Sequence, residues 1–199
     1  MASVLLVCLA SYLLGSIPHG LVFGKLLWHV DLREYGSHNI GAKNAWRTLG
    51  KGPGFLIFLL DFLKGALSVG LAEVFTASPL IMVIAGILAI VGHSCSLFLH
   101  FKGGKGVATG LGVIAMLMPV PSLIVFLGWL VSVMITKYVS LGSCIAAALV
   151  PVLAYVWGYP VPYTAFGVLA AAFIIRRHKS PIVRLMTGSE NKLHAGHRD

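Results

Sequence analysis

The chain has 199 residues, of which 58% are hydrophobic and 11% are charged, and its formal net charge is +9. This composition is too apolar for a soluble domain of ordinary make-up, so we interpret the chain as a membrane protein. The basic residues fall between apolar runs, so the positive charge indicates membrane topology and not a nucleic-acid partner. Cys8, Cys95 and Cys144 show no paired spacing. Neither a disulfide framework nor a zinc site is supported, and we expect no metal and no cofactor.

Seven apolar runs predict an all-α protein that crosses the membrane seven times. The first run, residues 1–24, carries no charge and is long enough for a hydrocarbon core, which needs about 20 apolar residues. It has no basic segment before it and no small-residue cleavage site in the right place, so we expect a retained helix. The other runs cover about residues 53–75, 79–98, 107–118, 120–136, 139–157 and 161–175. The run over 107–118 is short, so five or six spans with a hairpin or re-entrant pair are the alternative.

The loop-borne lysines and arginines all fall on one side of the seven-span arrangement. They occupy the segment 25–52, the loop at Lys102 and Lys105, the turn at Lys137 and the tail after residue 175, whereas the turns around Ala77, Pro119 and Tyr159 carry none. Cytoplasmic loops are the ones enriched in Lys and Arg, which predicts an outside N-terminus and a cytoplasmic C-terminus. No internal repeat or linker is apparent, so residues 1–199 are expected to form one domain.

The first polar segment contains a stretch that is dense in glycines and hydrogen-bonding groups. Ser37, Asn39 and Asn44 can donate to phosphate or hydroxyl groups, and Arg47 offers a planar fork that matches phosphate. The alternative is a solvated connector built from turn residues. We interpret the stretch as a candidate anion-binding segment.

Two ionisable residues lie well inside the second apolar run, and a third, Glu73, lies close to its outer end. Asp61 and Lys64 are three residues apart and can meet on one helix face. Buried ions in a bilayer are costly and are usually paired or functional, so we expect a structural ion pair that supports a site. His93, at the inner end of the third run, is a further candidate for site support, with a packed histidine as the alternative.

The stretch Phe101-Lys102-Gly103-Gly104-Lys105-Gly106-Val107-Ala108-Thr109 has the features of a phosphate-binding loop. Its three glycines allow positive φ and let backbone N–H groups approach a ligand, while Lys102 and Lys105 supply charge. The following apolar residues restart a helix, whose N-terminus favours an anion. The alternative is that the glycines pack helices, but packing does not explain the two lysines. It is not a Walker A loop, because Gly106 follows Lys105.

The tail opens with a basic cluster, Arg176-Arg177-His178-Lys179, and Arg184 follows it. Attraction to anionic membrane lipid accounts for Arg176 and Lys179 as readily as a substrate site does.

Taken together, these segments resemble the bacterial acyl-phosphate-dependent glycerol-3-phosphate acyltransferases, the PlsY family. The resemblance covers nearly the whole chain. It rests on Gly15-Ser16-Ile17-Pro18, Asp31-Leu32-Arg33, Gly36-Ser37, Asn39, Gly41-Ala42, Asn44, Arg47, Asp61-Phe62-Leu63-Lys64-Gly65, Gly92-His93, the stretch 101–109, Arg177-His178 and Arg184-Leu185.

The resemblance implies transfer of a fatty acyl group from acyl phosphate to the sn-1 hydroxyl of glycerol 3-phosphate, which gives lysophosphatidic acid and phosphate in the first acylation of phospholipid synthesis. It implies a multi-pass protein of the bacterial inner membrane, with its active site facing the cytoplasm. An enzyme that makes acyl phosphate is a candidate partner. The implied catalytic residues are Ser37, Arg47, Lys105 and His178. Arg184 is a candidate phosphate contact, and Ser143 is either a further contact or a helix-packing serine.

Three places depart from the family pattern. Lys43 stands where Thr is usual, Cys95-Ser96 stands where Phe-Pro is usual, and Pro181 stands where Asn is usual. Pro181 removes a side-chain amide that looks like a substrate contact in relatives.

Two other function classes stay open. One is a small anion transporter or channel with a basic vestibule, and the other is a non-catalytic lipid-binding relative. A transporter should carry ionisable groups near mid-membrane and paired inverted halves. Only Asp61 and Lys64 are charged residues placed away from the ends of a span, and no symmetry is visible, which favours the enzyme.

Overall fold

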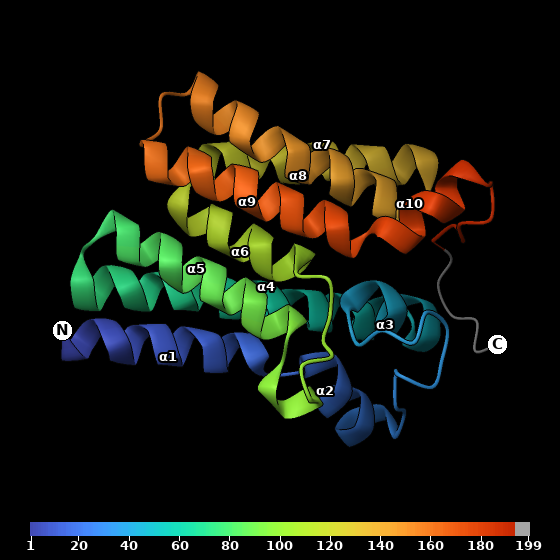
Figure 1. Cartoon of the computed structure of the whole chain (residues 1–199). Helices are drawn as coiled ribbons and strands as arrows, with labels where there is room; N and C mark the ends of the chain where they lie inside the picture. Colours follow the sequence, from blue (N-terminus) through green and yellow to red (C-terminus); the bar gives the residue numbers. More distant parts are fainter. Residues whose placement is uncertain (194–199) are drawn as a thin grey trace. The chain divides into compact units, whose positions relative to one another are not determined.

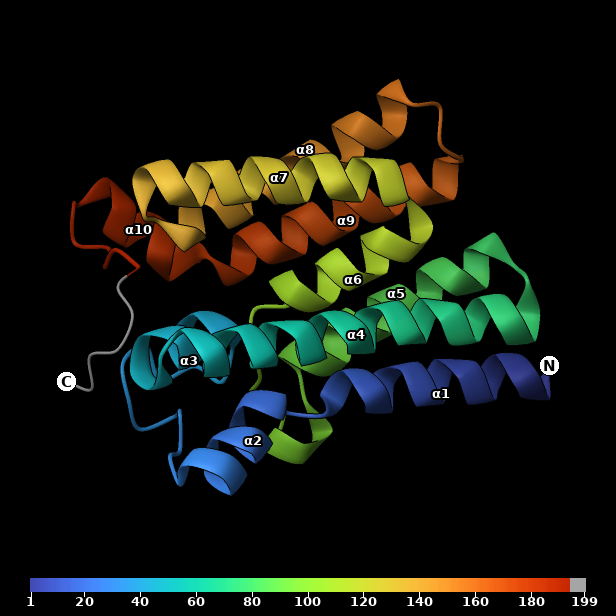
Figure 2. The same ribbon diagram turned by 180° about the vertical axis from the view of Figure 1, so that it is seen from behind.

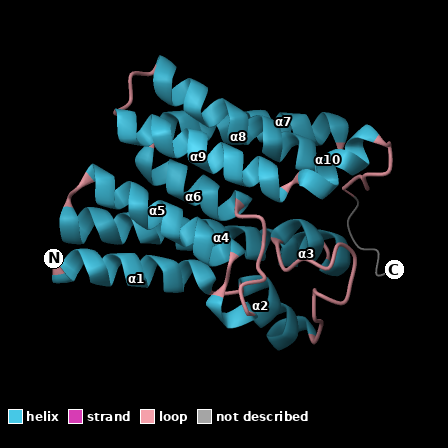
Figure 3. Ribbon diagram, viewed as in Figure 1, coloured by secondary structure: helices cyan, strands magenta, loops and turns pink. Residues whose placement is uncertain are grey.

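The computed structural model describes residues 1–193, and these form α-helices and one 3-10 turn without any strand (Figure 3). The all-α prediction is therefore confirmed for this part of the chain. The chain divides into two compact units, Met1–Val113 and Ile114–Leu193, and the boundary falls within one helix.

The first unit is built on three long helices that lie side by side (Figures 1 and 2). Small residues allow their close approach: a Cβ on Gly15 of one helix would overlap the backbone at Ala89 of another. Small residues at such crossings are typical of helix packing in membranes. The elements of this unit are α1 (Ala2–Ser16), α2 (His19–Trp28), α3 (Ala42–Leu49), α4 (Lys51–Thr76), α5 (Pro79–Ser94), the 3-10 turn η1 (Leu97–Leu99) and the start of α6 (Val107–Leu117).

The first apolar run is not one straight helix. It breaks at Ile17 and Pro18 into α1 and α2, which are bent by 44° relative to each other. Proline has no N–H to donate and its ring clashes with the preceding turn, which accounts for the break. The expected span over residues 1–24 is therefore corrected to a broken pair that ends at Trp28.

The second unit contains four helices after the end of α6. They are α7 (Pro119–Thr136), α8 (Val139–Val156), α9 (Val161–Arg177) and α10 (Lys179–Met186). Prolines stand at the starts of α7 and α9, where a missing N–H costs nothing. Within this unit α8 packs against both α7 and α9.

Four helical segments are long and apolar enough to cross a membrane, namely Lys51–Thr76, Pro79–Leu99, Pro119–Thr136 and Val139–Val156, and the bent pair of α1 and α2 makes a fifth if it is one span. These segments are those of an integral membrane protein. The shorter apolar helix α6 has 11 residues and α9 has 17. A count of seven would need both of these helices to cross as well.

Candidate active site

The glycine loop, residues 101–106, folds back onto the C-terminal turn of α5. The N–H of Gly103 donates to the carbonyl of Ser94 at 3.0 Å, and the N–H of Gly104 donates to the carbonyl of His93 at 3.0 Å. A Cβ at Gly103 would overlap the His93 carbonyl, and a Cβ at Gly104 would overlap the His93 ring. Gly106 has φ of +81°, which favours glycine. The loop thus needs glycine mainly because it packs directly on α5.

This packing corrects one expectation about phosphate binding. We expected the N–H groups of Gly103 and Gly104 to face a ligand, but both donate to α5 instead. The anion-binding groups that remain are those of the first turn of α6, where helix N–H groups have no partner within the helix. In the loop that precedes α6, Lys102 is exposed and Lys105 is half-buried. Thr109 is fully buried, and its Oγ1 forms no hydrogen bond within residues 1–193.

The stretch before α3 is held together by two asparagines. Asn44 is buried, its Oδ1 accepts the N–H of Ser37 at 2.9 Å, and its amide donates to the carbonyls of Leu32 and Tyr35 at 2.9 and 3.0 Å. Asn39 Oδ1 accepts the N–H of Gly41 at 2.9 Å. The Asn44 amide thus donates twice within the segment, and its predicted contact with a ligand stays a prediction.

The two predicted catalytic residues of this segment differ in exposure. Ser37 is exposed, so its hydroxyl reaches solvent. Arg47 lies on α3 and is half-buried, and its Nη2 is a buried nitrogen that forms no hydrogen bond within the described residues. An unsatisfied buried guanidinium nitrogen costs free energy. Arg47 is therefore suited to an anion that completes its hydrogen bonding.

Asp31 anchors the start of the same segment. Its Oδ2 lies 2.7 Å from Arg33 Nη2 and 3.0 Å from Lys25 Nζ. The hydrogen bond from the Arg33 side chain, more than the opposing effect of burial, holds the pKa of Asp31 well below its usual value of 3.8. The same contact raises the pKa of Arg33. Asp31 is thus an ionised anchor of the loop at neutral pH.

A cluster of buried ionisable side chains joins α2, α4 and α5 next to the glycine loop. Asp61 Oδ1 lies 2.9 Å from Lys64 Nζ, 3.2 Å from His19 Nδ1 and 3.7 Å from His93 Nδ1. Lys64 Nζ also donates to the carbonyl of Ile17 at 2.9 Å, at the break between α1 and α2. The expected pairing of Asp61 with Lys64 is confirmed. No group of three His, Cys, Asp or Glu side chains in residues 1–193 is arranged to hold a metal ion.

His19 is a member of this cluster that sequence reasoning missed. The available signal was a histidine directly after Pro18. A proline in an apolar run predicts a helix break, and a break leaves backbone groups that need polar partners. The unusual Cys95-Ser96 pair also contributes here: Ser96 Oγ donates to the carbonyl of Ser16 at 2.6 Å, and the Tyr12 hydroxyl donates to the carbonyl of Cys95 at 2.9 Å. These bonds tie the end of α1 to the turn that leads into the glycine loop.

In the second unit, Arg184 is held by a carboxylate of its own chain segment. Its Nε donates to Glu190 Oε2 at 2.7 Å, and Ser140 Oγ donates to Glu190 Oε1 at 3.0 Å. Glu190 is buried, whereas the Arg184 side chain is 43% exposed, so the pair lies at the protein surface. Arg184 therefore fixes the tail against α8, whereas we expected a phosphate contact.

Two other candidates lie in this unit. His178 is buried at the junction of α9 and α10, and its Nδ1 lies 2.8 Å from the carbonyl of Ile174, which orients the ring. Ser143 Oγ donates to the carbonyl of Val139 at 2.8 Å and accepts from Trp129 Nε1 at 3.3 Å. These bonds fit the helix-packing alternative for Ser143. Pro181 occupies the first turn of α10, where the helix does not need its N–H.

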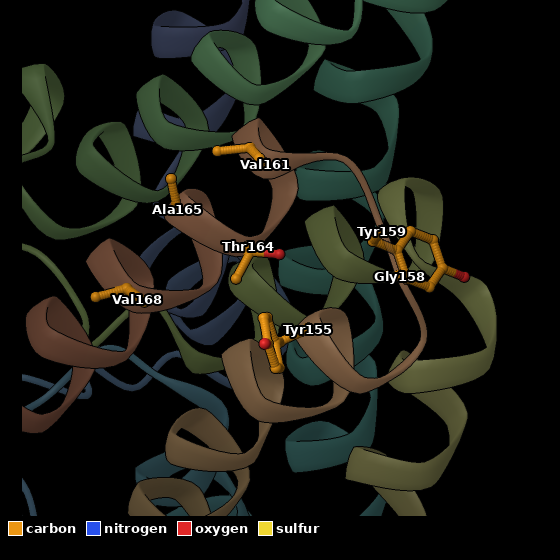
Figure 4. A pocket seen from close by; sticks show the side chains of 7 residues that line it. All are labelled: Tyr155, Gly158, Tyr159, Val161, Thr164, Ala165 and Val168. Carbon is orange, nitrogen blue, oxygen red and sulfur yellow. The ribbon is translucent and has the colours of Figure 1, made fainter.

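A hollow of about 490 Å³ opens at the turn between α8 and α9 (Figure 4). Its lining is almost entirely apolar and contains none of the predicted site residues. It is formed by Tyr155, Gly158, Tyr159, Val161, Thr164, Ala165 and Val168. Tyrosines at a helix end are typical of a membrane–water interface.

Comparison with known proteins gives matches over nearly the whole chain. A family model described as glycerol-3-phosphate acyltransferase matches residues 5–188. The chain is 41% identical over 188 residues to a glycerol-3-phosphate acyltransferase of Desulforamulus reducens, with 94% of each chain covered. It is 45% identical over 192 residues to one of Syntrophomonas wolfei, with 96% of each covered.

Two solved structures are also similar to the chain. One is the glycerol 3-phosphate form of PlsY (YgiH), an integral membrane glycerol 3-phosphate acyltransferase, with a TM-score of 0.91, 42% identity and 96% of each chain covered. The other is the lysophosphatidic acid form, with a TM-score of 0.89, 40% identity, and 96% of this chain and 95% of that chain covered.

Proposed function

Because the chain belongs to the glycerol-3-phosphate acyltransferase family, we propose that it acylates the sn-1 hydroxyl of glycerol 3-phosphate with acyl phosphate as donor. The products are lysophosphatidic acid and inorganic phosphate. The observation that carries the proposal is the match over almost the full length, to relatives named glycerol-3-phosphate acyltransferase and to structures described as glycerol 3-phosphate and lysophosphatidic acid forms.

The proposed chemistry asks the protein for positioning more than for a nucleophile. The substrate hydroxyl oxygen forms a bond to the acyl carbon, the bond from that carbon to the phosphate oxygen breaks, and its electron pair leaves with phosphate. A phosphate oxygen of the donor accepts the hydroxyl proton. An acyl phosphate is an activated mixed anhydride, so orienting both substrates and stabilising developing charge account for most of the task.

We assign the phosphate-binding groups of the first unit to Lys105 and the N-terminal turn of α6, together with Arg47. The buried Nη2 of Arg47 supports its assignment, because an anionic oxygen would supply the hydrogen bond that it lacks within the described residues. Ser37 is assigned to orienting glycerol 3-phosphate. We assign His178 and Ser143 to the substrates on the basis of the resemblance alone.

We also propose the membrane arrangement. Seven crossings, with α6 and α9 among them, place the N-terminus outside and the C-terminus in the cytoplasm of a bacterial inner membrane. The support is the distribution of Lys and Arg, which spares the turns around Ala77, Pro119 and Tyr159. The chain then acts as one acyltransferase domain whose site faces the cytoplasm, where the acyl-phosphate-forming enzyme would supply its donor.

The test is a donor comparison with purified protein. Matched chains are given as acyl phosphate and as acyl-coenzyme A with radiolabelled glycerol 3-phosphate, and lysophosphatidic acid is measured for the wild type and Lys105→Ala. We expect product from acyl phosphate, little from the thioester, and a large loss in Lys105→Ala, because the thioester brings no departing phosphate for Lys105 to hold. Comparable rates from the thioester that do not depend on Lys105 would contradict the proposed donor.

A further inference from the structure

The imidazole of His93 lies between a buried carboxylate and the glycine loop. The residue is only 5% exposed. At one edge of the ring, Nδ1 is 3.7 Å from Asp61 Oδ1 and forms no hydrogen bond within residues 1–193. At the other edge, Nε2 occupies the place where a Cβ on Gly104 would stand. The ring therefore fills the space between α4 and the loop.

The carboxylate behind the ring is itself fixed. Asp61 Oδ1 lies 2.9 Å from Lys64 Nζ and 3.2 Å from His19 Nδ1, and Lys64 is in turn held by the Ile17 carbonyl. Removing one partner of a buried ion pair leaves an uncompensated charge, which resists movement of any member. The His93 ring consequently has a rigid support on the side away from the loop.

We propose that His93 is a positioning residue for the donor phosphate. Supported by Asp61, its ring sets how closely Gly104 can approach α5 and so fixes the place of the neighbouring Lys105. The inference rests on the proposed function, in which Lys105 holds phosphate. It also explains why residue 104 is glycine, because a Cβ there would overlap the His93 ring.

The hydrogen bonds of the loop make this steric role effective. The N–H groups of Gly103 and Gly104 both donate to the last turn of α5, so they pull the loop toward the ring. The His93 ring limits how closely the loop approaches α5, and it does so at Gly104, the residue before Lys105. Opposing attraction and contact hold a group in place more closely than either alone, and rates depend steeply on such placement.

The first test uses a rescue pair. Gly104→Ala places a methyl group on the His93 ring, so we expect kcat/KM for acyl phosphate to fall by about 100-fold, the order for a small misplacement in a site. Adding His93→Ala removes the ring, and we expect at least about tenfold of that loss to return, since residues in contact are coupled.

Gly103→Ala is the matched control. Its Cβ would meet the His93 backbone carbonyl, which His93→Ala leaves in place, so no rescue is expected. An active wild type together with a double variant no more active than Gly104→Ala would overturn the positioning role. A wild type that makes no lysophosphatidic acid from acyl phosphate would instead contradict the proposed function.

A second measurement does not depend on whether Gly104→Ala folds. In His93→Ala alone, we expect the KM for acyl phosphate to rise by about five- to tenfold while the KM for glycerol 3-phosphate stays unchanged, because only donor binding loses its fixed lysine. General loosening of the fold would raise both. Equal changes in the two KM values, or no change in either, would overturn the inference.

Discussion

The hydrogen-bonding geometry of the Arg47 side chain can be tested separately from its charge. A lysine keeps the positive charge but cannot offer two parallel N–H donors. We expect Arg47→Lys to cost about 1–3 kcal/mol in transition-state binding, the order for a charged hydrogen bond. Steady-state kinetics would measure this as a fall in kcat/KM. Arg176→Lys is the control, because that side chain is exposed. Unchanged kinetics in Arg47→Lys would show that Arg47 does not hold phosphate through two parallel hydrogen bonds.

The lowered pKa of Asp31 predicts how the stability of the protein depends on pH. Its pKa is lowered in the folded protein relative to 3.8, so its stabilising effect is complete above about pH 4 and is lost as the pH falls through the folded pKa. We expect Asp31→Asn to lower the melting temperature at pH 7, with a difference that shrinks once the pH is brought below 3.8. Thermal unfolding in detergent at several pH values measures this, and a difference independent of pH would contradict it.

At the level of residues, the sequence predicted one ion pair correctly but did not show which polar side chains bond within the chain. Asp61 and Lys64 were paired correctly from their spacing, because helix geometry alone brings them together. Asn44 and Arg184 were assigned to ligands but bond within the chain. A polar residue looks the same in sequence whether its partner is a substrate or a backbone carbonyl, and only tertiary structure distinguishes the two.

The break between α1 and α2 has a role beyond bending the helix. It separates the Ile17 carbonyl from its usual helical partner, and that carbonyl instead accepts the N–H of His19 at 3.1 Å and Lys64 Nζ at 2.9 Å. In Pro18→Ala, the helix can continue and its backbone competes for the same oxygen. We therefore expect Pro18→Ala to lower the free energy of unfolding by about 1 kcal/mol, the order for a hydrogen bond, and so to lower the melting temperature.

Two comparisons make this result specific. The loss should be smaller when Lys64→Met is already present, because contacting residues are not additive. Pro160→Ala, at the start of α9, should have little effect, since it stands before a helix and does not break one. Equal losses in the presence and absence of Lys64→Met would show that the freed carbonyl does not matter.

The apolar helices could be predicted from hydropathy, whereas the polar helix α3 could not. The end of α6 at Leu117 and the start of α7 at Pro119 agree within one residue with the apolar runs and the proline signal. By contrast, α3 lies inside a segment that we expected to be polar loop, and its buried face includes Asn44 and Thr48. Such a helix is stabilised by packing on its neighbours, which a local pattern does not reveal.

At the scale of the whole molecule, the topology is open to a labelling test. In a background without the three native cysteines, a cysteine at Lys51 or Lys179 should be blocked only by reagents that reach the cytoplasm, and one at Ala77 only from outside. The reason is the one-sided placement of Lys and Arg. Ready labelling of Ala77→Cys from the cytoplasmic side in intact vesicles would rule out the seven-span arrangement.

The 11 residues of α6 have a consequence for the membrane around the protein. At 1.5 Å per residue this helix rises about 16 Å, roughly half of a hydrocarbon core of about 30 Å. In the proposed seven-span arrangement, its two ends cannot both reach the headgroups unless the bilayer thins locally, and hydrophobic mismatch of this kind costs fractions of a kcal/mol per Å. We therefore expect bilayer thickness to affect the reaction: in vesicles of graded acyl length, the shorter lipids should bring the glycine loop nearest to water.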